Sequence, residues 1–535
     1  MRDWIKNIFN TDEEPATEEW RNENSIYQFI SNNIDTTGKL KESAEELPDE
    51  KNGENDLRFA AGLSDTLFNN SESEETTAQI NELSTIIKRF AQYGDKKSDL
   101  KIYELIAANE NIVSLIDPVL EEMGKLGVPI EPYLFPYAQD LSFKATNRNA
   151  VKFGIAILGV CQRESVLDEI KTLGLHDEFT LYTTIAIINL SDDPEGDLWE
   201  LAKKVNGWGK IQAVDRLASM VTLPAIKDWL LLEGYKNDIM YEYLAYTCAV
   251  HGELDEKLSL PKIDRALYVA AGEIIEALIS GGPAEDISNY ESASITIEQY
   301  ARHSQEHATE VGDYIVLSSI FNLLQDIQDD MTDHAENGWT QDILSNCLID
   351  ISSILHRVDW EEKTWAALNS TDNTTYWSGK QAARLLGLDV WDVYWKKLQA
   401  SPHEGSLWYD VINEYTDIHT DEIIDLAIKT IPLEELATGP EDLLGLGTNF
   451  TKFQGLDFIL PFLERYPAKG EPILLATLNS KVTRHRNFSL RVLSKWGKEN
   501  WSPAIAAAFE KLKGLEPNQD TKSNIEKLER GEALD

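Results

Sequence analysis

The sequence predicts an all-α protein built from a long series of stacked helix pairs. Two observations support this fold class. From about residue 78 to residue 513, apolar residues recur at the spacing of amphipathic helices, and the alternation that marks a β-strand is hard to find. Prolines suited to first helical positions divide parts of this region into units of about 30 to 40 residues, the period of helical-hairpin repeats.

Six X-Pro pairs are expected to open helices, because the missing proline N–H would be unpaired in the first helical turn anyway. They are Asp117-Pro118, Asp193-Pro194, Leu223-Pro224, Leu260-Pro261, Gly439-Pro440 and Ser502-Pro503. Segments 150–161 and 181–190 are apolar on nearly every side. We therefore expect these two helices to be covered by neighbours on both flanks.

Composition divides the chain into four parts. Residues 10–79 hold 18 acidic and 5 basic side chains, so we interpret residues 1–77 as an acidic, partly mobile tail or loosely packed cap, with a short helix around residues 26–30. The rest is divided into two halves of the helical repeat and a C-terminal tail: 78–290, 291–513 and 514–535.

The formal charge of −43 argues against nucleic acid and anionic lipid as main partners, because both are bound through Lys and Arg. No apolar run reaches the length of a membrane span, and the N-terminus lacks the apolar core of a secretory signal. We therefore expect a cytoplasmic protein. Its three cysteines, Cys161, Cys248 and Cys347, lie far apart in apolar segments and are interpreted as buried structural thiols.

A second regularity falls on the helices expected to form an inner layer, where Lys or Arg precedes a small residue and then an apolar one. It occurs in NRNAVKFG (147–154), GWGKIQAVDRL (207–217), SGKQAARLLG (378–387) and RHRNFSLRVL (484–493). At these residues the chain resembles HEAT and armadillo-like repeat proteins. The resemblance implies a HEAT-like α-solenoid, a superhelix of stacked helical hairpins with a concave binding face, and no particular chemistry. An α/α toroid is the alternative architecture.

The run NGWGKIQAVDRL (206–217) is also similar to a segment of bacterial helical proteins labelled as limonene (terpene) hydroxylases. That resemblance implies a cofactor that activates oxygen. None of the nine histidines has a glutamate three residues before it, as the di-iron helical pattern requires, and Cys161 lacks the setting of a haem-thiolate ligand. We therefore predict no cofactor, and an enzymatic role stays open but is not favoured.

An Asp-Asp-x-x-Asp motif is formed by Asp329, Asp330 and Asp333 in DDMTD (329–333). This spacing holds Mg²⁺ in class I isoprenoid synthases. The second Mg²⁺ motif of that family is absent downstream. We therefore keep the three aspartates only as weak metal-ligand candidates, against the interpretation of a solvated acidic helix end.

A second metal-like motif, HSQEH (303–307), places His303 and His307 on one helix face. It matches the inverted zinc-peptidase pattern, in which Glu306 would be the base. The third ligand of that family has no counterpart here. The two histidines stay weak candidates, and we predict no metal site.

Six of the fourteen tryptophans fall between residues 360 and 408. This density suits an aromatic groove for a sugar or peptide, whereas the four-residue spacing of Trp391 and Trp395 suits core packing. We retain Trp377, Trp391, Trp395 and Trp408 as candidate binding residues. Whether the region is core or faces a ligand stays open.

A locally basic helix lies near the C-terminus, where residues 481–513 hold 8 basic and 2 acidic side chains. If Phe488 marks the buried side, Arg491, Lys495 and Lys498 fall together on the opposite face. On so acidic a protein, these cations are expected to contact carboxylates of a partner or of the N-terminal segment.

The predicted function is that of a protein-binding scaffold or adaptor, which uses the concave face of a helical solenoid. The alternative is an all-α enzyme with a pocket for an apolar or sugar substrate. Another protein is the expected partner, without nucleic acid or a membrane span, and the oligomeric state is open.

Overall fold

The structure is a computed structural model that describes residues 20–50, 61–62, 74–109, 111–329, 338–414 and 417–534. Within these ranges the chain is all-helical and has no β-strand, only three isolated β-bridges. The predicted all-α class is confirmed. The described chain divides into two compact units, with the boundary between Arg357 and Val358, which lies inside the segment 291–513 that we treated as one half of the repeat.

The first unit contains the helices from α2 to α20. Their bounds are α2 (Ile26–Asn32), α4 (Glu74–Tyr93), α5 (Lys96–Ala107), α6 (Val113–Lys125), α7 (Leu134–Lys144), α8 (Arg148–Val160), α9 (Leu167–Leu173), α10 (Asp177–Leu190), α11 (Pro194–Ala202), α12 (Gly207–Ala218), α13 (Pro224–Trp229), α14 (Ala245–His251), α15 (Leu254–Leu258), α16 (Arg265–Ser280), α17 (Ala293–His307), α18 (Val311–Asp329) and α20 (Gln341–Leu355). A single π-helical turn, η3 (Leu230–Gly234), continues α13.

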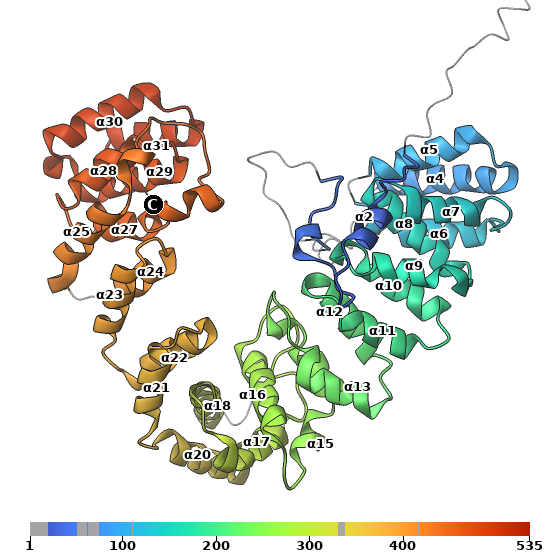
Figure 1. Cartoon of the computed structure of the whole chain (residues 1–535), viewed down its shortest axis with the longest axis horizontal. Helices are drawn as coiled ribbons and strands as arrows, with labels where there is room; N and C mark the ends of the chain where they lie inside the picture. The colour runs from blue at the N-terminus through green and yellow to red at the C-terminus, as the bar shows by residue number, and fades with distance from the viewer. Residues whose placement is uncertain are drawn as a thin grey trace, which may run out of the picture. The chain divides into compact units, whose positions relative to one another are not determined.

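Helices of the first unit pack mainly on near neighbours in the chain (Figure 1). α8 packs on α7 and α10, α10 packs on α12, and α16 packs on α17 and α18. Because α8 is covered on both flanks, it is buried without a break from Ala150 to Ile155, as the sequence predicts. α10 follows the prediction less completely, since Ile185 and Ile188 are 41% and 37% exposed.

Residues 20–50 pack closely on the first unit. The short helix expected in this segment is α2, and the hydroxyl of Ser25 caps its first turn. Arg21 forms ion pairs with Asp99 at 2.8 Å and with Asp140 at 2.9 Å. These contacts anchor the part of the acidic N-terminal segment that the structure describes.

Three of the six helix starts predicted at proline are confirmed, as the first residues of α11, α13 and α30: Pro194, Pro224 and Pro503. The other three predictions are wrong. Pro118 lies inside α6, whereas Pro261 and Pro440 lie in connections that do not lead directly into a helix. In α6 the buried side chains of Ile116 and Val119 flank Pro118, so packing keeps the helix together despite the missing N–H donor.

The second unit contains the helices from α21 to α31. Their bounds are α21 (Trp360–Leu368), α22 (Asn373–Leu386), α23 (Trp391–Ala400), α24 (Gly405–Glu414), α25 (Thr420–Thr430), α26 (Leu433–Leu436), α27 (Leu456–Leu463), α28 (Glu471–Leu478), α29 (Thr483–Trp496), α30 (Pro503–Leu515) and α31 (Gln519–Glu529). α29 is central, since it packs on α27, α28 and α31.

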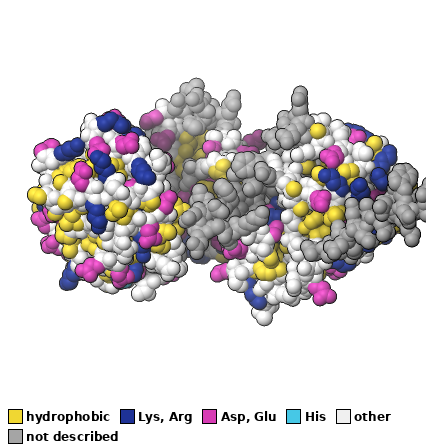
Figure 2. All heavy atoms as spheres, turned by 90° about the horizontal axis from the view of Figure 1, so that it is seen from above, with side chains coloured by type: hydrophobic (Ala, Val, Ile, Leu, Met, Phe, Trp, Pro, Cys, Tyr) yellow, Lys and Arg dark blue, Asp and Glu magenta, His cyan; other side chains and the backbone are white. Residues whose placement is uncertain are grey.

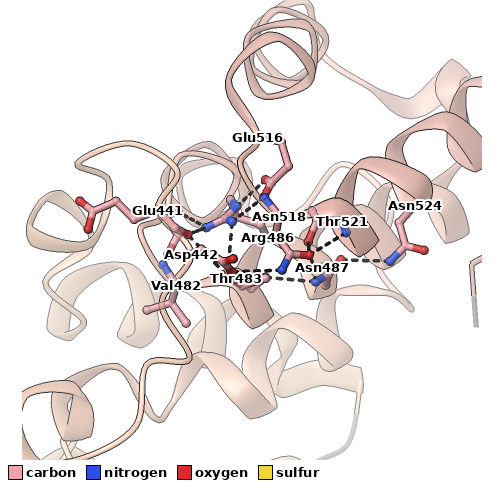
Figure 3. Close-up of polar contacts among 11 residues, drawn as sticks. Glu441, Asp442, Val482, Thr483, Arg486, Asn487, Glu516, Asn518, Thr521 and Asn524 are labelled. Atoms are coloured by element: carbon pink, nitrogen blue, oxygen red, sulfur yellow. Dashed lines mark hydrogen bonds and ion pairs between the residues drawn. The ribbon is translucent and has the colours of Figure 1, made fainter. Parts of the chain in front are cut away.

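A buried ion pair joins α29 to the residue after α30 (Figure 3). Nε and Nη2 of Arg486 donate to the two carboxylate oxygens of Glu516, both at 2.6 Å. Nη1 donates to the carbonyl oxygens of Glu441 and Ser480 at 2.8 Å, and Nη2 also donates to the Thr483 hydroxyl at 3.4 Å. The guanidinium group is thus paired on every side, as a fully buried cation must be.

The visible surface mixes side-chain types. Acidic, basic and hydrophobic side chains are interspersed on the face of each unit that Figure 2 shows. Among the described helices, none combines the length and the apolar character that crossing a bilayer requires.

Candidate functional site

A cleft of about 890 Å³ lies in the first unit and is the strongest candidate site. Three stretches form most of its walls: residues 39–45 after α2, residues 203–210 around the start of α12, and residues 229–241 after α13. Its volume is in the range of pockets that bind drug-sized ligands or short peptide segments. The charged lining residues are Lys39, Lys41, Lys203, Lys204, Lys210 and Lys236, together with Glu42, Glu45, Asp177, Glu233 and Asp238.

The ratio of basic to acidic residues is higher in the lining of this cleft than in the whole sequence. The lining holds six basic and five acidic residues, whereas the whole sequence holds 49 basic and 92 acidic ones. A protein with nearly two acids for each base therefore has a cleft in which the bases outnumber the acids. The local charge of the cleft is therefore far less negative than the charge of the whole chain.

Three of the lysines contact neighbouring protein groups. Lys203 pairs with Glu200, and Lys236 pairs with the Glu233 carboxylate at 3.0 Å. Lys210 donates to the backbone carbonyl of Glu233 at 2.9 Å. The contacts with Glu233 keep the ammonium groups of Lys210 and Lys236 close to the wall formed by residues 229–241, whereas Lys203 is held against α11.

The other three lysines are available to a ligand. Within the described chain, the ammonium groups of Lys39, Lys41 and Lys204 make no hydrogen bond or ion pair with the protein. The Lys204 side chain runs beside Gly38, so its end lies next to the loop that carries Lys39. Lysines from two distant segments are thereby brought to one opening.

Asp177, the first residue of α10, lines the floor of the cleft and faces the start of α12. Its carboxylate accepts hydrogen bonds from the backbone N–H groups of Trp208 and Gly209. A Cβ atom on Gly209 would lie 2.6 Å from a carboxylate oxygen, and one on Gly207 would clash as well. Gly207 also has a φ of +57°, which favours glycine. Both glycines therefore allow Asp177 to cap α12, and this carboxylate already fills the anion position at the helix N-terminus.

Burial perturbs the titratable groups of the floor. It raises the pKa of Asp177 to about 7, although the two backbone hydrogen bonds oppose the shift. Burial also lowers the pKa of His176 to about 4. Both shifts follow from the cost of placing a charge where water is excluded.

An ion-pair cluster lies next to this floor. Lys152 contacts Glu178 at 2.6 Å, and Arg148 contacts Asp49 at 2.9 Å and Glu178 at 3.7 Å. Burial raises the pKa of Glu178, but Lys152 and Arg148 outweigh this effect and lower it to about 2. The cluster holds α8, α10 and the segment around Asp49 together, so its role is to support the cleft.

The two titratable groups of the floor form hydrogen bonds with the backbone. Nδ1 of His176 accepts the backbone N–H of Glu178 at 3.2 Å, and Nε2 lies 3.3 Å from the carbonyl oxygen of Glu45. Both ring nitrogens are therefore used by backbone groups. The Asp177 carboxylate likewise accepts its hydrogen bonds from backbone N–H groups, at the start of α12.

The HSQEH histidines do not converge on a common point. Their ring centroids on α17 are 6.5 Å apart. Nε2 of His303 lies 2.9 Å from the carbonyl oxygen of Leu258, while His307 stacks on Tyr268. Among the described residues, no group of three or more His, Cys, Asp or Glu side chains is placed to hold a metal ion.

The acidic motif is only partly described. Asp329 is the last residue of α18, whereas Asp330 and Asp333 lie outside the described residues. The three cysteines are free and buried, as predicted. Burial raises the pKa of Cys161 to about 11 and that of Cys347 to about 12, so these thiols stay protonated at neutral pH.

The four candidate tryptophans have different environments in the second unit. Trp408 is fully buried in the core. Trp391 and Trp395 stack with a centroid distance of 5.4 Å and are partly buried against that core. Trp377 is 52% exposed, and the ammonium group of Lys380 lies 3.8 Å from its ring centroid. Of the four, Trp377 alone is more than half exposed.

The three cations near the C-terminus do not share one continuous helix. α29 ends at Trp496, and Gly497 has a φ of +75°, so Lys498 lies in the next turn and donates to the carbonyl oxygen of Glu529 at 3.2 Å. The predicted common face is therefore wrong for this residue. Arg491 pairs with Glu464 at 3.3 Å, and Lys495 is exposed.

The cleft was not predicted from the sequence, although two signals pointed toward it. One was the pair of glycines around Trp208, at the start of the run GWGKIQAVDRL (207–217). The other was the density of lysine at residues 203, 204 and 210 within an acidic chain. No spacing in the sequence connects these lysines to Lys39 and Lys41.

Comparison with known proteins adds no assignment. No model of a known protein family matches the chain, and no curated protein is similar enough to count as a relative. The geometry of the cleft is therefore the basis for a functional interpretation.

Proposed function

We propose that this protein is a binding module, a helical scaffold that holds a protein partner through the lysine-lined cleft of the first unit. The observation that carries the proposal is the cleft itself. It is large, three of its ammonium groups have no partner among the described residues, and its buried acid and histidine both form hydrogen bonds with the backbone. Such a lining supports recognition of a ligand rather than its conversion.

The packing of the first unit supports a HEAT-like α-solenoid as the architecture. Apart from α2, the helices are covered mainly by helices near them in the chain, as in proteins whose repeats contact only their neighbours. Solenoids of this kind commonly bind other proteins along an extended surface. A cytoplasmic location fits the three free cysteines, because reduced thiols persist in that compartment.

Site-specific photo-crosslinking in cells tests the proposal. A photoreactive phenylalanine analogue replaces Tyr241, which lines the cleft, and a control probe replaces Tyr93, which is 70% exposed on α4. We expect a discrete crosslinked protein from position 241 and not from position 93. Mass spectrometry identifies that protein, and binding is then measured with both purified components.

Two results would contradict a binding module. The first is an identical, non-specific pattern of products from both probe positions. The second is a small molecule that copurifies, is bound in the cleft and is chemically converted, which would favour the all-α enzyme instead.

A further inference from the structure

We infer that the cleft recognises an acidic, extended peptide segment of the partner, whose carboxylates pair with Lys39, Lys41 and Lys204. This inference rests on the proposed function, because it names the chemistry of the ligand for the same site. It goes further than the fold, since HEAT-like architecture specifies no ligand chemistry.

Unpaired lysines are the first line of support. Lys39 and Lys41 lie on the loop after α2, and Lys204 approaches that loop beside Gly38. In a chain with 92 acidic side chains, these three ammonium groups line one cleft without a protein partner among the described residues. Carboxylates presented by a ligand would complete charge pairs that the protein leaves open.

Crowding of like charges is the second line of support. Burial lowers the pKa of Lys210, and the positive charges of Lys39 and Lys236 add to this effect. The lysines of opposite walls are thus close enough to repel one another. A bound anion would relieve that repulsion, so binding should be strongest when the ligand carries several negative charges.

The distribution of charge favours a peptide over a compact polyphosphate. The acidic side chains of Glu42, Glu45 and Asp238 lie among the lysines in the lining. Dense phosphate charge would be placed near these carboxylates, whereas an acidic peptide carries single charges several ångströms apart and can direct them toward the lysines. Trp229 and Tyr241 add aromatic surface for its other side chains.

The N-terminus of α12 does not contribute to this recognition. Asp177 already accepts the hydrogen bonds of Trp208 and Gly209, so a ligand anion would have to displace a buried carboxylate. Binding therefore depends on lysine side chains, and it should weaken steeply with added salt.

The test uses the full chain and a fluorescein-labelled ten-residue peptide with five glutamates, followed by fluorescence anisotropy. The matched peptide has glutamine at those five positions. The cleft variant is Lys39→Glu with Lys204→Glu. Its control is Lys97→Glu with Lys262→Glu, which makes the same change in net charge at exposed lysines outside the cleft lining.

We expect the cleft variant to weaken glutamate-peptide binding about 10- to 100-fold, from two lost ion pairs and two new repulsions. The control variant should stay within about twofold, and the glutamine peptide should bind at least about tenfold more weakly. Hydrogen exchange should slow at residues 33–41 and 203–210 when the glutamate peptide binds.

Equal binding of the two peptides, or equal loss in both double variants, would overturn the inference. Inorganic tripolyphosphate is the competing probe. If it binds the cleft while the glutamate peptide does not, the site recognises phosphate and the peptide assignment is wrong. If position 241 crosslinks a protein but neither anion binds, the binding module stands and only its proposed ligand chemistry fails.

Discussion

The buried pair of Arg486 and Glu516 gives a direct test of what holds the second unit together. In Glu516→Gln the neutral amide keeps the shape of the side chain, but it removes the negative charge and one of the two acceptor oxygens. Arg486 would then be a buried cation that retains its bonds to Glu441, Ser480 and Thr483 but has no counter-ion. Both partners have no exposed side-chain surface, so solvent cannot compensate for the loss.

Removing one partner of a buried ion pair costs about 3 to 5 kcal/mol. This loss corresponds to hydrogen exchange that is about 10² to 10⁴ times faster in α29, if those amides exchange through opening of the second unit. Native-state hydrogen exchange with mass spectrometry measures the change on the full chain and reads the second unit separately. The control is Glu532→Gln, which breaks an exposed contact with Arg530 and should leave α29 unchanged.

A double variant separates the charge from the packing. Arg486→Met with Glu516→Leu replaces both charges by apolar groups, so it should recover most of the stability that either single change loses. The reasoning is refuted if Glu516→Gln exchanges like Glu532→Gln. It is also refuted if the double variant is as unstable as the single one, since shape rather than charge would then be decisive.

Three further predictions concern the first unit. Asp177 has a folded pKa of about 7, above its reference value of 3.8, so its ionisation makes the fold less stable as pH rises through that window. Asp177→Asn should therefore stabilise the fold at pH 8 by about 2 to 4 kcal/mol, which is measured as a higher melting temperature. At pH 4 the substitution should have little effect. Gly209→Ala should lower the melting temperature because its Cβ would displace the Asp177 cap, whereas Gly124→Ala, with no atom within 4 Å of the added Cβ, should raise it slightly. Added zinc should leave thermal unfolding unchanged in the wild type and in His303→Ala, because Nε2 of His303 faces a backbone carbonyl; zinc-dependent stabilisation lost in the variant would contradict this geometry.

The helical class followed from local information. Apolar residues at helical spacing favoured an α-helix wherever the face they formed could be buried, and α8, which is apolar on nearly every side, is buried accordingly. Proline opened helices at Pro194, Pro224 and Pro503, where its missing N–H costs nothing. At Pro118 the same local preference was overridden, because the neighbouring apolar side chains pack on both sides of it.

Residue spacing in the sequence predicted the candidate sites less well than it predicted the helices. Arg491 and Lys495 both lie on α29, but Arg491 lies beside Phe488 rather than opposite it, and α29 ends before Lys498 at Gly497, which has a positive φ. The four-residue spacing of Trp391 and Trp395 was interpreted as core packing, and the two rings stack on each other while only partly buried. Their partial burial depends on α24 and the rest of the second-unit core, which the spacing alone does not specify.

The cleft was decided entirely by tertiary structure. The sequence shows that acidic residues outnumber basic ones. It therefore indicates that an anion can bind only where the fold gathers basic side chains in one place. Lys39 and Lys204 are 165 positions apart, and they meet because α2 packs on α7 and α9 and thereby carries the following loop toward α12. Periodicity reports on contacts between residues a few positions apart, whereas a binding site of this kind depends on which distant segments are packed together.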